Sequence, residues 1–118
     1  MNTRVLTRAE LKALYPAPAP PTLDELAAIE RLLAIAERDT GQSRRAANFL
    51  LAWWNADRDG GFDLTDLWAV DTALARDMVT VFVMVARVHS YPDTLGYGSR
   101  FEPLVDAWRP KRGGGDRG

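Results

Sequence analysis

The chain has 118 residues and a net charge of −1, with 47% hydrophobic and 26% charged residues. This balance is typical of one folded domain, so it excludes a wholly disordered chain and gives no global attraction to nucleic acid or anionic membranes. The absence of cysteine excludes disulfides, a thiolate nucleophile and a cysteine-bound metal.

No segment of the sequence has the length and composition of a targeting or membrane-spanning element. The N-terminal residues lack the apolar run of a signal peptide. The longest apolar run, residues 78–86, is too short to cross a bilayer, which needs about 20 residues. We therefore expect a cytoplasmic protein without a membrane partner.

Helix starts are indicated by capping boxes, in which a Ser, Thr or Asp accepts a hydrogen bond from a free backbone N–H and an acid three residues later bonds back. The chain has four such pairs: Thr7/Glu10, Thr22/Glu25, Asp63/Asp66 and Ser99/Glu102. Asp66 is a weaker match than Glu because its side chain is shorter. These pairs predict four separate helix starts.

The first half of the chain is predicted to contain three helices. A short helix over 8–14 ends before Pro16, and the stiff connector APAPP follows. A helix over 23–38 has apolar residues at helical spacing and ends at Thr40-Gly41. A third helix, 43–56, has its aromatic residues on one side.

The second half is predicted to contain one long helix and one short helix. No Gly or Pro interrupts residues 64–88, although Asp71 could cap a new helix and divide the segment. Because residues flanking the apolar stripe are also apolar, we expect the helix over about 72–88 to be central and buried. After an irregular loop, a last helix covers 100–108.

These elements predict an all-α protein, a compact bundle of about five helices in a single domain. The domain covers residues 1–110, of which 1–21 form the short N-terminal helix and the Pro-rich connector. Residues 111–118 have the Gly-rich composition of a disordered tail.

The strongest local motif is the segment 55–66, which follows the pattern of an EF-hand calcium loop between two predicted helices. Asparagine at its first position lacks charge, and aspartate at its twelfth reaches an ion less well than glutamate. A polar turn ending in a helix cap explains the same residues. We expect no resident cofactor and keep calcium or magnesium binding as the alternative, with these ligands: Asn55, Asp57, Asp59, Asp63 and Asp66.

A second alternative is a helix-turn-helix DNA-binding regulator formed by the second and third helices. Arg44 and Arg45 would then meet phosphate near the start of the recognition helix. The rest of that helix is apolar, and the net charge also disfavours nucleic acid as a partner.

Catalysis has little support in the sequence. His89 is the only histidine and lies beside Ser90, without an acid or nucleophile in a recognisable motif. There is no phosphate-binding loop or dinucleotide-binding fingerprint. We therefore expect the protein not to be an enzyme.

Protein binding is indicated by the four tryptophans, all of which fall within predicted helices. We expect three of them in the core, and one of the adjacent pair Trp53 and Trp54 partly exposed, where it could anchor an interface. The loops 57–61 and 90–99 are the other expected contact regions. The candidate partner-binding residues are Trp54, Arg58, Tyr91, Asp93 and Tyr97.

Four strings, DTGQSRRAANFLLAWWNA, GGFDLTDLWAVD, SYPDTLGYG and AWRP, together resemble a family of small proteins of unknown function. That family is encoded on proteobacterial integrative and conjugative elements, and the resemblance covers roughly residues 30–110. It implies a bacterial cytoplasmic accessory protein of a mobile element and transfers no residue role. We expect a non-enzymatic protein-binding accessory protein, of which an anti-CRISPR-type inhibitor of a host defence complex is a concrete version.

Overall fold

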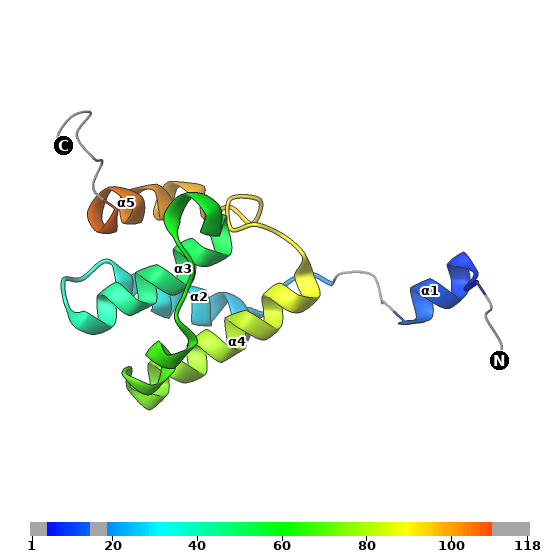
Figure 1. Ribbon diagram of the computed structural model, residues 1–118, viewed down its shortest axis with the longest axis horizontal. Coiled ribbons are helices and arrows are strands. Elements are labelled where there is room, and N and C mark those ends of the chain that lie inside the picture. The colour runs from blue at the N-terminus through cyan, green and yellow to red at the C-terminus, as the bar shows by residue number, and fades with distance from the viewer. Residues whose placement is uncertain (1–4, 15–18, 110–118) are drawn as a thin grey trace.

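The computed structural model describes residues 5–14 and 19–109, and within these ranges the chain forms helices and no β-strand (Figure 1). The all-α prediction is confirmed. The predicted tail, 111–118, and the first part of the Pro-rich connector lie outside the described residues. The elements are α1 (Arg8–Leu14), α2 (Leu23–Ala36), α3 (Gly41–Asp59), the 3-10 helix η1 (Leu64–Trp68), α4 (Thr72–Val88) and α5 (Gly98–Trp108).

Two of the predicted capping boxes are confirmed. At the start of α2, the Thr22 hydroxyl accepts from the Glu25 N–H, and the Glu25 carboxylate accepts from the Thr22 N–H at 2.9 Å. The pair Thr7 and Glu10 makes the same reciprocal bonds before α1. These helix starts follow from side chains three residues apart, so local sequence determines them.

The other two boxes do not form. Asp63 caps η1 by accepting from the Thr65 N–H, but Asp66 lies 3.5 Å from the Arg45 guanidinium and does not bond back. Ser99 lies inside α5, whose first turn is closed by the Tyr97 carbonyl accepting from the N–H of Phe101. The preceding turn, in which the Tyr97 N–H donates to the Pro92 carbonyl, and the burial of Phe101 set the start of this helix, so tertiary packing overrides the local signal.

The segment 64–88 is two helices. Asp71 adopts an extended conformation and its side chain accepts from the Leu74 N–H at 2.8 Å, so it is the N-cap of α4. The other bounds differ from the predictions by a few residues. In α3, the helix continues to Asp59 across a kink at Asn55, whose φ and ψ are −161° and 88°.

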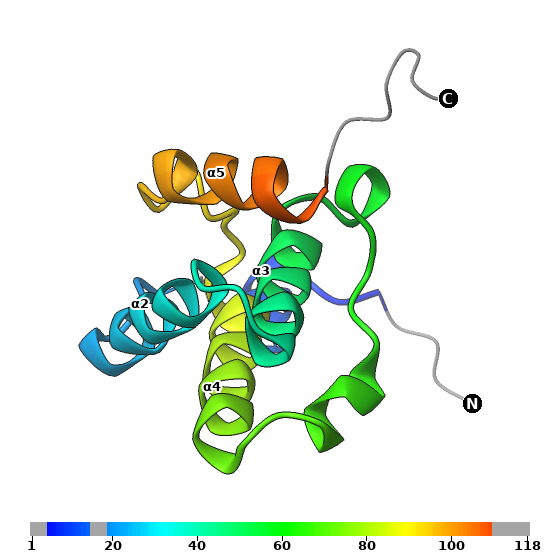
Figure 2. The same cartoon turned by 90° about the vertical axis from the view of Figure 1, so that its left-hand side faces the viewer.

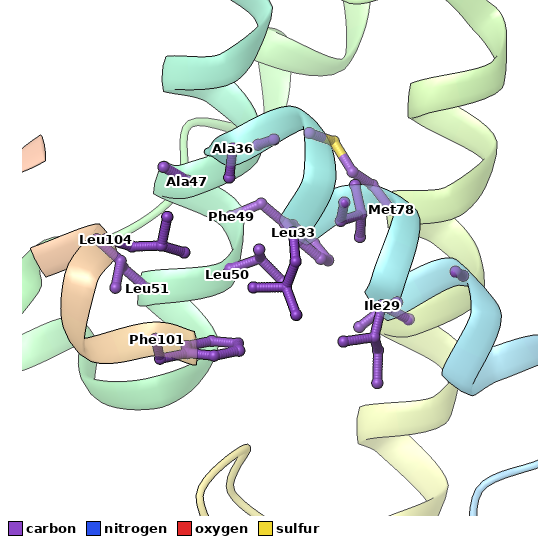
Figure 3. Packing of buried hydrophobic residues seen from close by; sticks show 14 of the residues in the cluster. Ile29, Leu33, Ala36, Ala47, Phe49, Leu50, Leu51, Met78, Phe101 and Leu104 are labelled. Atoms are coloured by element: carbon purple, nitrogen blue, oxygen red, sulfur yellow. The ribbon is translucent and has the colours of Figure 1, made fainter. Parts of the chain in front are cut away.

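The centre of the bundle is the pair α2 and α3. α4 packs mainly on α2 and α5 on α3, and Figures 1 and 2 show these two helices on opposite sides of the central pair. Figure 3 shows Leu33 of α2, Leu50 of α3, Met78 of α4 and Phe101 of α5 meeting in one apolar cluster. No helix among the described residues is long and apolar enough to cross a membrane.

The position of α4 corrects the expectation of a central, buried helix. Leu74, Met78, Val81, Met84 and Val88 are buried on one side of α4. Its opposite side includes exposed Val79, Phe82 and Val83. The apolar residues flanking the stripe therefore do not enclose the helix in the core, and they leave an apolar surface without a partner in the described chain.

Polar contacts hold α4 against α2. Arg87 of α4 donates to both oxygens of Glu25 at 2.6 and 2.7 Å and also to the Pro20 carbonyl. Arg31 of α2 makes a similar two-pronged contact with Asp77, at 2.9 Å for each bond. Glu25 at the start of α2 contacts Arg87 at the end of α4, and Arg31, farther along α2, contacts Asp77 near the start of α4. The two helices therefore run antiparallel.

The end of α5 closes the ends of two other helices. The Trp108 indole N–H donates to the carbonyl of Ala36, the last residue of α2, at 3.0 Å. The Arg109 guanidinium donates to the carbonyl of Asp59, the last residue of α3, at 2.7 Å. Both carbonyls would otherwise lack a helical partner.

Candidate functional site

An apolar groove of about 560 Å³ lies between α3, η1 and α4. Its walls are hydrophobic side chains with almost no polar atoms facing the space. We call it the apolar groove and define it by its lining residues: Phe49, Ala52, Trp53, Phe62, Leu64, Leu67, Met78, Val79, Phe82 and Val85.

Several large apolar side chains on and beside the groove are exposed. Phe82 is 62% exposed, and Leu64 and Val79 are exposed by more than half. Trp68, next to the groove residue Leu67, is 85% exposed. A soluble domain rarely leaves so many large apolar side chains uncovered in one region, and such surfaces mark binding sites for proteins or ligands.

The segment between α3 and α4 forms one wall of the groove because it is fixed at several points (Figure 2). Phe62 packs edge-on against Phe49 of α3, with ring centroids 5.3 Å apart. The Asp71 N–H donates to the Gln42 side chain at 2.9 Å. Together with the contact of Arg45 to Asp66, these bonds hold the segment at its two ends on α3.

A second cleft, of about 510 Å³, adjoins the groove and shares Ala52 and Trp53 with it. We call it the aromatic cleft. Its lining is more polar than that of the groove and includes two carboxylates. Its residues are Ala52, Trp53, Trp54, Asn55, Ala56, Asp57, Tyr91 and Asp93.

The aromatic cleft brings together three predicted partner-binding residues, Trp54, Tyr91 and Asp93. Arg58 lies beside them, with its guanidinium carbon 4.8 Å from the centroid of the Trp54 ring. Tyr97 does not line the cleft. It packs against the core, where burial and the nearby Glu30 carboxylate raise the pKa of its hydroxyl.

The five predicted metal ligands are not gathered around one point. In the described ranges 5–14 and 19–109, no three Asp, Glu, His or Cys side chains form a group able to hold a metal ion. Asp59 is buried and paired with Arg58, at 2.8 Å for each of two bonds. The Asn55 side chain accepts from the Arg58 N–H, and Asp57 lies in the last turn of α3.

The remaining two candidate ligands also have local partners. The Asp63 carboxylate accepts from the Thr65 hydroxyl and N–H, which lowers its pKa. Asp66 is paired with Arg45. Calcium coordination by this segment would therefore require several of these contacts to break.

The residues of the DNA-binding and catalytic hypotheses line neither cleft. Arg44 is exposed, whereas Arg45 is half-buried and also donates to the Gly41 carbonyl. His89 ends α4 in the left-handed conformation, with φ of 59°, and its ring bonds the Ala86 carbonyl at 3.0 Å.

Trp68 is the tryptophan that sequence reasoning misplaced. Trp53, Trp54 and Trp108 are half-buried against the core, and the indole N–H of Trp53 donates to the Ser90 carbonyl. Trp68 lies in a 3-10 helix, where side chains repeat every three residues, so helical spacing taken from α4 does not apply to it. The break at Asp71 was the signal for this change.

Comparison with known proteins gives one match. No curated protein and no solved structure matches the chain. A model for a family of unknown function, DUF7673, matches residues 26–109, which include most of α2, all of α3 to α5 and both clefts, but not α1. The chain therefore belongs to the DUF7673 family of unknown function.

Proposed function

We propose that this protein is a non-enzymatic protein-binding module that takes the apolar face of a partner's helix into the apolar groove. The observation that carries the proposal is the exposure of Phe82, Val79 and Leu64 around an apolar space of about 560 Å³. Burying these side chains under a partner would gain roughly 25 cal/mol for each Å² of apolar surface removed from water.

The shape of the groove favours a helix as the bound element. Along α4, the groove extends from Met78 to Val85, which is two helical turns or about 10 Å. Amphipathic helices bind apolar grooves through side chains at positions i, i+3, i+4 and i+7, which cover a similar length. Trp68 beside the groove would add the kind of large aromatic anchor that often dominates binding energy.

The cellular setting in this proposal is an accessory role for a bacterial mobile element, in the cytoplasm. This part is supported by the four sequence strings and the resemblance they carry. Inhibition of a host defence complex is a form of the same activity. If such a complex has a helix that fits the groove, binding of that helix would block the complex. The groove itself supports binding and does not distinguish among these partners.

Site-specific photocross-linking in cells that express the chain tests the proposal. A photoreactive phenylalanine analogue replaces Phe82 in the groove, and in a matched chain it replaces Leu23, which is 84% exposed at the start of α2. We expect a covalent conjugate with a protein from position 82 and none from position 23.

The mass of the conjugate identifies the kind of partner. A conjugate of the chain with a different protein supports a heterologous partner, and one of twice the chain mass shows a second copy. Equal yields from positions 82 and 23, or no conjugate from position 82, would contradict groove-mediated binding.

A further inference from the structure

Charge is distributed unevenly between the N-terminal segment and the helical body. Residues 19–109 contain fourteen acidic and nine basic residues, a net charge of −5, although the whole chain has a net charge of only −1. Residues 1–18 contain three basic residues and one acidic residue, a net charge of +2. The N-terminal segment is therefore attracted to an acidic body of the kind that this chain itself provides.

α1 lacks the packing that a short helix needs. It has seven residues, and Val5, Leu6 and Leu11 in and before it are exposed. Figure 1 shows it apart from the helices of the bundle. Isolated helices shorter than about 12–15 residues are marginal in water, so α1 gains stability when its leucines are buried against a surface.

The apolar groove fits α1 in length and in charge. A seven-residue helix is about 10 Å long, the same as the stretch of α4 from Met78 to Val85. The groove is bordered by exposed Asp63, and the adjoining aromatic cleft contains Asp57 and Asp93. The apolar walls therefore match leucines, and the acidic border matches the basic residues of the N-terminal segment.

α1 lies apart from α3, η1 and α4, which form the groove of its own molecule (Figure 1). The Pro20 carbonyl is held by Arg87, at 3.4 Å. Arg87 follows Phe82 by five residues, about 140° around α4, so Pro20 lies on the side away from the groove. The six Cα–Cα steps from Leu14, the end of α1, to Pro20 span at most about 21 Å. Passing about 140° around a helix of about 10–12 Å diameter uses more than half of that length.

We propose that α1 of one copy binds in the apolar groove of a second copy, and that the reciprocal contact makes a two-fold dimer. This inference rests on the proposed function, because it assigns an occupant to the same groove. In a two-fold arrangement, each α1 helix is bound and each groove is filled. Two-fold symmetry is also the usual geometry of homodimers. The family match begins at residue 26, so α1 lies outside the matched residues.

Analytical ultracentrifugation of the full chain tests the dimer. We expect a mass of twice the 13.1 kDa of one chain, falling towards 13.1 kDa on dilution. Leu11→Asp, which places a charge on α1, should give the mass of one chain at the same concentrations. The control Leu23→Asp changes a leucine that is even more exposed than Leu11, at 84% against 45%, and that lies outside α1 and the groove, so this variant should remain a dimer.

A mixing experiment shows that the contact is between copies. Phe82→Asp disables the groove but keeps α1, whereas Leu11→Asp disables α1 but keeps the groove. Each variant alone should sediment as one chain, and their equimolar mixture should form a dimer through its one intact pair. Circular dichroism verifies that both variants keep the helices of the bundle, as expected for substitutions at exposed positions.

Three outcomes would overturn the inference: a wild-type chain of 13.1 kDa throughout, a dimer that Leu11→Asp leaves intact, or a mixture that stays monomeric. None of them removes the proposed function, because photocross-linking from position 82 to a different protein would still be observed. Absence of all conjugates from position 82 would remove both.

Discussion

Glu25 of α2 lies beside α4 and the segment at Pro20, and its charge is expected to control the stability of the fold at acidic pH. Its carboxylate accepts from the Thr22 N–H and receives two bonds from Arg87. The bonds from Arg87 are the main reason that the pKa of Glu25 is about 2 rather than its ordinary 4.5. The proton therefore binds much more weakly to the folded chain than to the unfolded chain.

The pKa difference sets both the size and the direction of the effect. A fall from 4.5 to about 2 corresponds to at most about 3 kcal/mol of folding free energy. Because the Arg87 side chain is 37% exposed, solvent screens the pair, and we expect about 1.5 kcal/mol. Since the folded-state pKa is the lower one, this stability is fully present above pH 4.5 and is lost as the pH falls through about 2.

The variant Glu25→Gln isolates this contribution. Glutamine removes the charge, but its side-chain oxygen can still accept the capping-box hydrogen bond from the Thr22 N–H. Urea unfolding of both chains at a series of pH values should show Glu25→Gln less stable by about 1.5 kcal/mol at pH 7. The difference between the two free energies of unfolding should shrink below pH 4.5 and vanish as the pH falls through about 2. Parallel curves over the whole range would refute the assignment of the depressed pKa to the contact with Arg87.

Three further predictions concern the core, a helix end and the candidate ion loop. Phe101→Ala should lower the free energy of unfolding by about 3–5 kcal/mol in urea titrations, because Phe101 is fully buried; Phe82→Ala, at an exposed position, should change that of the single chain by under about 0.5 kcal/mol. His89→Gly should raise stability by about 0.5–1 kcal/mol, since glycine adopts the left-handed conformation without strain, and a loss would show that the ring contact with Ala86 matters more. Calcium should leave the melting temperature unchanged, because Asp59 and Asp66 are paired with arginines; a rise that Asp57→Asn removes would re-establish the ion-binding hypothesis.

Features set by residues close in sequence were predictable. The capping boxes at Thr7 and Thr22 gave the starts of α1 and α2 correctly, because each uses bonds across three residues. The box at Ser99 failed because the preceding turn, in which the Tyr97 N–H donates to the Pro92 carbonyl, delivers the chain to Gly98 already positioned for a helix. A turn of this kind depends on its contacts with the body of the protein.

The apolar groove was not predicted, although its main signal was visible in the sequence. Apolar residues all around 72–88 indicate a helix enclosed by others, but α2 and α3 form the centre, and among residues 5–14 and 19–109 no helix covers Phe82. Sequence periodicity identifies which residues are apolar on each side of a helix. It does not give the number of neighbours, which follows from how the helices pack.

Some of the partner-binding candidates could be predicted, because the sequence indicates which segments form loops or exposed positions. Trp54, Tyr91 and Asp93 come from two such segments, and the structure brings them into one cleft. Tyr97 belongs to one of these segments and faces the core, because the turn that begins at Tyr91 reverses the chain before α5.

The two side-chain bonds at the end of α5 have a consequence for how the protein opens. Since Trp108 and Arg109 close the last carbonyls of α2 and α3, the ends of these two central helices can fray only when α5 lifts away. Opening at three helix ends is then one cooperative event, and amide hydrogens near them should exchange with solvent at a common rate. A short helix at the edge of the bundle thereby synchronises the motions of the pair at its centre.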